Sequence, residues 1–259
     1  MPRNFCELRF AVAILMIALV TCRSSYAARA NRTSESSDSL TVVIDAGHGG
    51  HDRGGIPGQR IAEKDMTLDV AQRLRNLLSA NGYRVVMTRD SDVFVPLPTR
   101  VAIANSYRNA IFVCIHFNAT KRMGASGIET YFYSRDSLPL ASAVHYYVTG
   151  GAPSANRGVR RRGYYVLRKT AIPAVLVECG FLTNPTEGAY AQTASYRQKL
   201  ADEIAAGVRG RNSLGSASFI DQTKVARSER HRSKRSHKKS ARKKKSSSKP
   251  AGAEEASAH

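Results

Sequence analysis

The sequence lacks several features that would assign its class at once. It has only four cysteines and no Cys-x-x-Cys pair, which excludes the common cysteine-based zinc and redox motifs. The apolar run Phe10–Val20 holds eleven residues, whereas about 20 are needed to cross a bilayer, so a retained membrane anchor is disfavoured. Acidic residues are scarce, with 20 Asp and Glu against 40 Lys and Arg. The net charge of +20 favours anionic partners.

The N-terminal segment has the pattern of an export signal. Arg3 and Arg9 give a positive start, the apolar run follows, and small residues then recur at the spacing of a signal-peptidase site, in Ser25-Tyr26-Ala27 and Ala28-Arg29-Ala30. We therefore predict a signal peptide over residues 1–30 and a serine-rich linker over 31–40. The protein is expected to be exported, to the periplasm or cell envelope.

The C-terminal segment is strongly basic. Lys224–Lys249 contains thirteen Lys or Arg and one acid, Glu229, and no aromatic residue. Such a composition cannot form a core, so residues 212–259 are predicted to be a disordered tail. Without aromatic residues the tail cannot stack on bases, and its binding would be purely electrostatic. We expect it to bind anionic envelope polymers or lipids, and no specific nucleic acid.

Strand and helix patterns alternate between residues 41 and 211. The predicted strands are Thr41–Asp45, Tyr83–Thr88, Ile111–His116, Gly127–Tyr133, Tyr164–Leu167 and Ala174–Glu178. The predicted helices are Glu63–Ala80, Pro98–Tyr107, Ser137–Val148 and Ala194–Val208. This alternation predicts a single α/β domain whose largely parallel sheet is flanked by helices. In such sheets functional sites gather at the carboxyl ends of the strands.

Four ionisable residues are expected at that edge. His48 lies in a glycine-rich turn after the first strand, and His116 and Glu178 each end a very apolar strand. Glu63 opens the first helix on its inward face, where it is either an acid favoured by the helix dipole or a metal ligand. A buried charge without a partner is costly, so these residues require one another, a metal or water.

The set His48, Glu63 and His116 has the ligand types that Zn²⁺ prefers, with a fourth position left for water. Glu178 is then free to act as the general base on that zinc-bound water, which predicts a metal-assisted hydrolase. The other histidines compete poorly. His51 is expected to be solvated in the glycine loop, and His145 to be a packed or surface residue of a helix.

Several ordered motifs resemble the zinc-dependent N-acetylmuramoyl-L-alanine amidases of the amidase-3 type. They are Ile44-Asp45-Ala46-Gly47-His48-Gly49-Gly50, Glu63-Lys64-Asp65, Ile115-His116-Phe117-Asn118-Ala119 and Val177-Glu178-Cys179-Gly180-Phe181-Leu182-Thr183-Asn184. The resemblance covers roughly residues 41–210. It implies a twisted, six-stranded mixed sheet and cleavage of the amide between N-acetylmuramic acid and L-alanine in peptidoglycan. It also implies zinc on His48, Glu63 and His116, and catalysis by Glu178.

Substrate residues and regulation are less constrained. The resemblance nominates Asn118 and Arg157 for substrate binding, and Arg157 belongs to an arginine-rich segment that is otherwise read as a solvated loop. Cys114 and Cys179, beside His116 and Glu178, are expected to be buried thiols, although a disulfide between them is an alternative. No separate inhibitory helix fits between Tyr133 and Tyr164, and any protein activator is unknown.

Two other hypotheses about the function remain open. The first is a zinc peptidase or deacetylase acting on cell-wall fragments, because the same ligands would serve its chemistry. The second is a non-catalytic envelope-binding protein, for which the basic tail is the evidence.

Overall fold

The computed structural model describes residues 39–122 and 124–213. The predicted signal peptide, most of the predicted linker and all but the start of the basic tail lie outside these residues, and so they remain predictions. Among the helices of the described residues, none combines the length and the apolar character needed to cross a bilayer.

A single six-stranded sheet forms the centre of the domain, with the strand order β2-β1-β3-β6-β4-β5. The strands are β1 (Thr41–Ala46), β2 (Arg84–Met87), β3 (Ala110–Asn118), β4 (Ile128–Phe132), β5 (Asn156–Arg161) and β6 (Ala174–Phe181). Neighbouring strands are parallel except for β4 and β6, which pair antiparallel. The predicted fold class, a mostly parallel mixed sheet flanked by helices, is confirmed.

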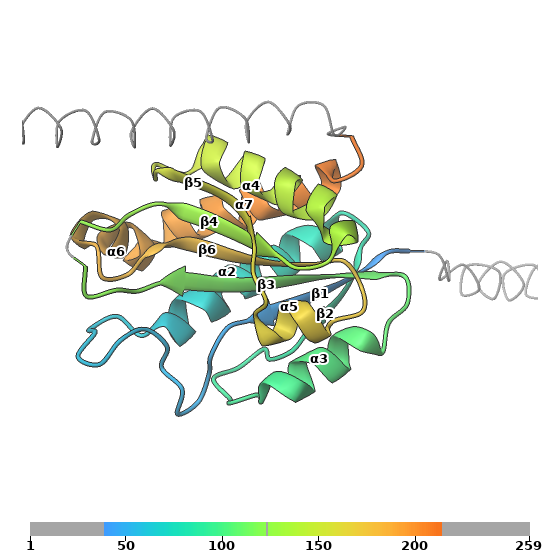
Figure 1. Ribbon diagram of the computed structural model, residues 1–259, viewed down its shortest axis with the longest axis horizontal. Coiled ribbons are helices and arrows are strands. Elements are labelled where there is room, and N and C mark those ends of the chain that lie inside the picture. Colours follow the sequence, from blue (N-terminus) through green and yellow to red (C-terminus); the bar gives the residue numbers. More distant parts are fainter. Residues whose placement is uncertain (1–38, 123, 214–259) are drawn as a thin grey trace, which may run out of the picture. The chain divides into compact units, whose positions relative to one another are not determined.

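Helices cover both faces of the sheet (Figure 1). They are α2 (Glu63–Ala80), α3 (Leu97–Asn105), α4 (Leu138–Gly151), α5 (Tyr165–Lys169), α6 (Pro185–Gln192) and α7 (Ala194–Gly210). The helices α3 and α5 pack together on one face, while α2 and α4 lie on the other with α7 packed against both. The first of these, α2, starts with the acids Glu63 and Asp65, which suit the positive end of a helix dipole.

Alternation along the strands divides the core into two layers. Val43, Phe112 and Leu176 point toward α3 and α5 and belong to one buried cluster with Val101 and Leu167. Because side chains alternate between faces, His116 on β3 shares the face of Phe112, and Glu178 on β6 shares the face of Leu176. Both functional candidates therefore lie on the α3 and α5 side, at the carboxyl ends of their strands.

One predicted strand is wrong. Tyr164–Leu167 does not join the sheet, because Tyr165–Lys169 forms the short helix α5. Two consecutive residues of this helix, Val166 and Leu167, are both buried. The strand that completes the set of six is instead β5, Asn156–Arg161, which was expected to be a loop. It pairs only with β4 and is an edge strand. The helix α6 was not predicted.

The two cysteines of the domain are confirmed as free, buried thiols. Cys114 donates to the carboxylate of Asp45 at 3.0 Å, so the thiol is part of a polar contact under the sheet edge. Between Tyr133 and Tyr164 the structure has a single 3₁₀ turn (Arg135–Ser137), α4 and β5. No further helix occupies this fully described segment.

Candidate active site

The loop after β1 holds His48 in an uncommon conformation. Its φ angle is 61°, a left-handed value that few non-glycine residues adopt. Asp52 fixes the ring, with Oδ2 2.8 Å from Nδ1, which turns Nε2 toward Glu63 at 3.1 Å from Oε2. A carboxylate on the second nitrogen is how ligating histidines are commonly oriented.

Glu63 lies at the centre of the site. It is the first residue of α2 and only 3% exposed, yet its carboxylate contacts both histidines. Backbone N–H groups hold it from two sides, since Phe117 donates to Oε1 at 2.9 Å and Gly55 donates to Oε2 at 3.1 Å. Of the two roles open to Glu63, this position favours that of a ligand.

His116 completes the group from β3. Its Nδ1 lies 2.9 Å from Glu63 Oε1. The ring packs so closely on Gly47 that a Cβ atom there would lie 2.4 Å from it. Gly47 is therefore needed for the close approach of the His48 loop to β3.

These three residues fit a metal ion. One ligand atom from each of His48, Glu63 and His116 lies within 4.8 Å of the others. Two imidazoles and one carboxylate are a donor set suited to Zn²⁺ at a catalytic site, where a fourth position stays open. The structure thus brings together the three residues that the sequence nominated.

Mutual contacts shift the protonation of this group in the metal-free protein. Burial alone would raise the pKa of Glu63, but the contacts with His116 and His48 lower it to about 2. Burial opposes charge on His48, and the acids Glu63 and Asp52 outweigh it and raise the pKa of His48 to about 9. The pKa of His116 is also raised, because Glu63 outweighs burial. In the metal-free protein an ionised Glu63 therefore favours the protonated form of both histidines.

Glu178 lies beside these three candidate ligands. It pairs with His116 across the parallel strands β3 and β6. Its Oε2 is buried and has no hydrogen-bond partner in the described part of the chain. Burial raises the pKa of Glu178 to about 7, with His116 opposing the shift and the acids Glu63 and Glu129 adding to it. A carboxyl with this pKa exchanges a proton readily near neutral pH.

The sequence profile of the amidase-3 family, described as N-acetylmuramoyl-L-alanine amidase, matches residues 42–210. This chain belongs to the amidase-3 family. The matched region includes residues of all six strands, and it contains His48, Glu63, His116 and Glu178.

Individual relatives agree with this assignment. YqiI of Bacillus subtilis is 36% identical over 181 residues, which cover 68% of this chain and 87% of that protein. The N-acetylmuramoyl-L-alanine amidase LytC of B. subtilis is 34% identical over 168 residues, covering 63% of this chain but only 34% of its own length. A crystal structure of an N-acetylmuramoyl-L-alanine amidase from Clostridium difficile 630 superposes with a TM-score of 0.65 at 36% identity, covering 69% of this chain and all of that one.

Two buried arginines of this family member hold the His48 loop in place. Arg100 donates to the carbonyl of His48 and to the carboxylate of Asp45, both at 2.7 Å. Arg89 donates to the carbonyls of Ala46, Gly47 and Lys64, at 2.8 to 2.9 Å. A buried arginine leaves no signature in hydrophobic periodicity, so the role of neither arginine was predicted from the sequence.

Glu129 on β4 was also not predicted as a site residue. Glu129 is buried and pairs with Glu178 across the antiparallel strands. Arg160 and Arg157 approach its carboxylate at 3.0 and 3.4 Å, and the hydroxyl of Tyr131 donates to it at 2.8 Å. The sequence signal was an acid inside a short strand that also holds Ile128, Tyr131 and Phe132.

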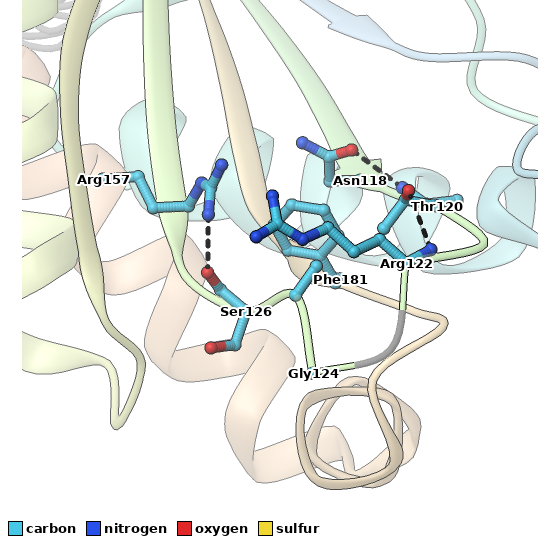
Figure 2. Close-up of a pocket in the computed structure, with 9 residues that line it drawn as sticks. Asn118, Thr120, Arg122, Gly124, Ser126, Arg157 and Phe181 are labelled. Carbon is cyan, nitrogen blue, oxygen red and sulfur yellow. Dashed lines mark hydrogen bonds between the residues drawn. The ribbon is translucent and has the colours of Figure 1, made fainter. Parts of the chain in front are cut away.

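The two residues nominated for substrate binding lie together, whereas the two histidines that were not nominated lie elsewhere. Asn118, at the end of β3, and Arg157, on β5, line one pocket next to the site (Figure 2). His51 is exposed, and its ring packs at a tilt against Phe94. His145 is buried in α4 between Thr130 and Asn156, and so it is a packed residue of this amidase-family domain.

Proposed function

We propose that this protein hydrolyses the amide bond between N-acetylmuramic acid and L-alanine in peptidoglycan, using zinc held by His48, Glu63 and His116. Family membership supports the reaction. The observation that supports the catalytic role is the position of Glu178 beside the three candidate ligands. Its buried Oε2 has no hydrogen-bond partner among the described residues.

The proposed roles follow from the positions of the side chains. When bound by His48, Glu63 and His116, a zinc ion would polarise the scissile carbonyl and lower the pKa of a water molecule. Glu178 takes the proton from the attacking water as hydroxide adds to the carbonyl carbon. It then gives that proton to the leaving nitrogen as the carbon–nitrogen bond breaks. A pKa of about 7 suits both transfers, because neither protonation state is strongly favoured at neutral pH.

Asp52 and the backbone support this chemistry without taking part in it. Asp52 keeps Nε2 of His48 directed inward, and the N–H groups of Phe117 and Gly55 hold the Glu63 carboxylate in position. A rigid ligand set of this kind costs little reorganisation during the reaction.

The enzyme is proposed to act outside the cytoplasm. The predicted signal peptide supports export, and relatives include a "Probable cell wall amidase LytH" of Staphylococcus epidermidis. The basic tail is proposed to tether the enzyme to anionic envelope polymers or lipids. Deleting residues 224–259 is expected to weaken binding to isolated wall sacculi most strongly at low salt, because counterion screening reduces the attraction. Equal binding of both forms at every salt concentration would contradict the tether.

The reaction is tested with the protein lacking residues 1–30, loaded with zinc and incubated with intact peptidoglycan. Mass spectrometry of the soluble products is expected to show free stem peptides that begin with L-alanine. Glu178→Gln and His116→Ala are expected to make none of them. Asp202→Asn, which neutralises an exposed carboxylate on α7, is the matched control and should retain activity.

Other products would redirect the assignment. Cleavage within the peptide, or release of acetate, would keep the metal site and replace the amidase by a zinc peptidase or deacetylase. Zinc binding without any product would point to a missing activator or to a binding protein. A fully active Glu178→Gln variant would refute the proposed base.

A further inference from the structure

A pocket of about 550 Å³ opens beside the proposed catalytic group. Its walls come from the end of β3, the segment that joins β3 to β4, the start of β5 and the end of β6. The polar and aromatic side chains that line it are Asn118, Thr120, Arg122, Ser126, Arg157 and Phe181 (Figure 2).

Arg157 is held so that one edge of its guanidinium faces this pocket. Its Nη1 donates to the carbonyl of Ser126 at 3.2 Å, and its Nε lies 3.4 Å from the buried carboxylate of Glu129. The guanidinium also lies over the ring of Phe181, 5.1 Å from its centre. These contacts fix the side chain and reduce the entropy lost when it binds a ligand.

Arg122 brings a second positive charge to the same space. Its side chain points in the direction of Arg157 (Figure 2). Its backbone N–H donates to Thr120, whereas its guanidinium has no hydrogen bond or ion pair within residues 39–122 and 124–213. Two guanidinium groups in one pocket repel each other unless an anion lies between them.

The rest of the lining is also poor in negative charge. No Asp or Glu lines the pocket, and Glu129, whose buried carboxylate Arg157 approaches, is not among the lining residues. The side-chain oxygen of Asn118 accepts from the N–H of Ala119, which leaves its amide hydrogens free to donate. A pocket rich in donors and free of acids is complementary to an anion, and guanidinium matches a carboxylate in a bidentate manner.

The position of the pocket sets how far this anion lies from the reaction. Asn118 follows His116 by two residues on β3, and Phe181 follows Glu178 by three on β6. At about 3.3 Å per residue, the pocket is roughly 7–10 Å from the proposed site of attack. An extended peptide covers that distance in two to three residues.

We propose that this pocket binds a carboxylate of the stem peptide at the second or third residue, and that Arg122 and Arg157 make the enzyme select stems with a free carboxylate there over stems in which it is amidated. The inference rests on the proposed function, since it assigns the recognition of that substrate. It adds Arg122 as a residue that determines specificity.

The experiment compares synthetic muramoyl peptides that carry either a carboxylate or a carboxamide at the second residue, at the third, or at both. We expect kcat/KM of the wild-type enzyme to fall about 10- to 100-fold when the recognised carboxylate is amidated, as for loss of hydrogen bonds to a charged group. Arg122→Gln should reduce kcat/KM for the acidic substrate and leave the amidated one unchanged. Arg122 is exposed, so the variant is expected to fold.

The control is Arg161→Gln, which removes the same charge from β5 outside the pocket lining. It should keep the full preference for the acidic substrate. Calorimetric binding of the same peptides to the Glu178→Gln variant gives a second readout that does not depend on turnover.

The outcomes separate the two proposals. If no muramoyl peptide is cleaved, the proposed function fails. If acidic and amidated substrates are cleaved equally well, or if Arg161→Gln loses the preference as Arg122→Gln does, the reaction stands and the carboxylate pocket is refuted.

Discussion

Replacing Glu178 by glutamine should stabilise the metal-free protein at alkaline pH while it removes activity. Burial raises the pKa of Glu178 from 4.5 to about 7, so the folded state holds a proton that the unfolded state releases. Folded stability due to this group is therefore present below pH 4.5 and is lost as the pH rises through 7. Glutamine keeps the shape and cannot ionise.

The size of the effect follows from the shift. Each pKa unit corresponds to about 1.4 kcal/mol, so an increase from 4.5 to about 7 amounts to about 3 kcal/mol well above pH 7. Near pH 4.5 the difference between wild type and variant should approach zero. The raised pKa of His48 adds a further loss of stability toward pH 9 in both proteins.

The assay is urea unfolding of chelator-treated wild type and Glu178→Gln at pH 5 and pH 8.5. Glu187→Gln is a matched control, because this carboxylate is also buried but is fully satisfied. It accepts from the N–H groups of Gly127 at 2.8 Å and Phe181 at 2.7 Å, and from the hydroxyl of Ser154. Glu187→Gln should destabilise the protein by about 1–3 kcal/mol, since an amide NH₂ replaces an acceptor.

A gain in stability for Glu178→Gln that is the same at both pH values would refute this reasoning. It would show that packing, and not the ionisation of a buried acid, distinguishes the two side chains. Destabilisation by Glu178→Gln at pH 8.5 would show that the wild-type carboxylate has a partner when ionised.

Three further predictions concern other parts of the domain. Gly47→Ala should lower zinc affinity in equilibrium competition with a chelator, because its Cβ would lie 2.4 Å from the His116 ring, whereas Gly150→Ala, which meets nothing within 4 Å, should not. Burial lowers the pKa of His145 below 6.5, so the unfolded state binds more protons there, and the wild type should lose stability relative to His145→Gln as the pH falls below 6.5. Burial raises the pKa of the Cys114 and Cys179 thiols, so a thiol reagent should label them only after denaturant is added, as followed by mass spectrometry.

The candidate site was largely predictable from the sequence because its residues end apolar strands. A run such as Ala174–Val177 must be buried, and the first ionisable residue after it must lie at the sheet edge. Two such endings, at His116 and Glu178, meet when their strands are neighbours, which the pairing of β3 with β6 satisfies. His48 was predicted at the same edge because its glycine-rich turn directly follows the first strand.

The sixth strand could not be found by the same reasoning. In β5 only Val159 is strongly apolar, and the remaining positions are polar, charged or glycine. The strand is an edge strand, where the pairing of backbone groups with β4 and the packing of arginine stems replace apolar burial, as for Arg161 over Tyr133. Tyr164–Leu167 has the composition of a strand, but the consecutive residues Val166 and Leu167 are both buried, as a helix against α3 allows.

Contacts between residues that are far apart in the sequence could not be predicted either. Glu129 lies opposite Glu178 only because β4 runs antiparallel to β6, a choice that one-dimensional patterns do not record. The pocket position of Arg122 depends in the same way on the path of the segment between β3 and β4.

The pairing of His116 with Glu178 also indicates which parts of this enzyme can vary between relatives and which must stay fixed. The spacing between a candidate ligand and the proposed base is set by neighbouring strands about 4.8 Å apart at the centre of the sheet, so loop motion does not alter it. Arg122, in contrast, comes from a connecting segment that supplies no candidate ligand. We expect that segment to be exchangeable between relatives, with stem-peptide preference transferred along with it and the rate on each enzyme's preferred substrate retained.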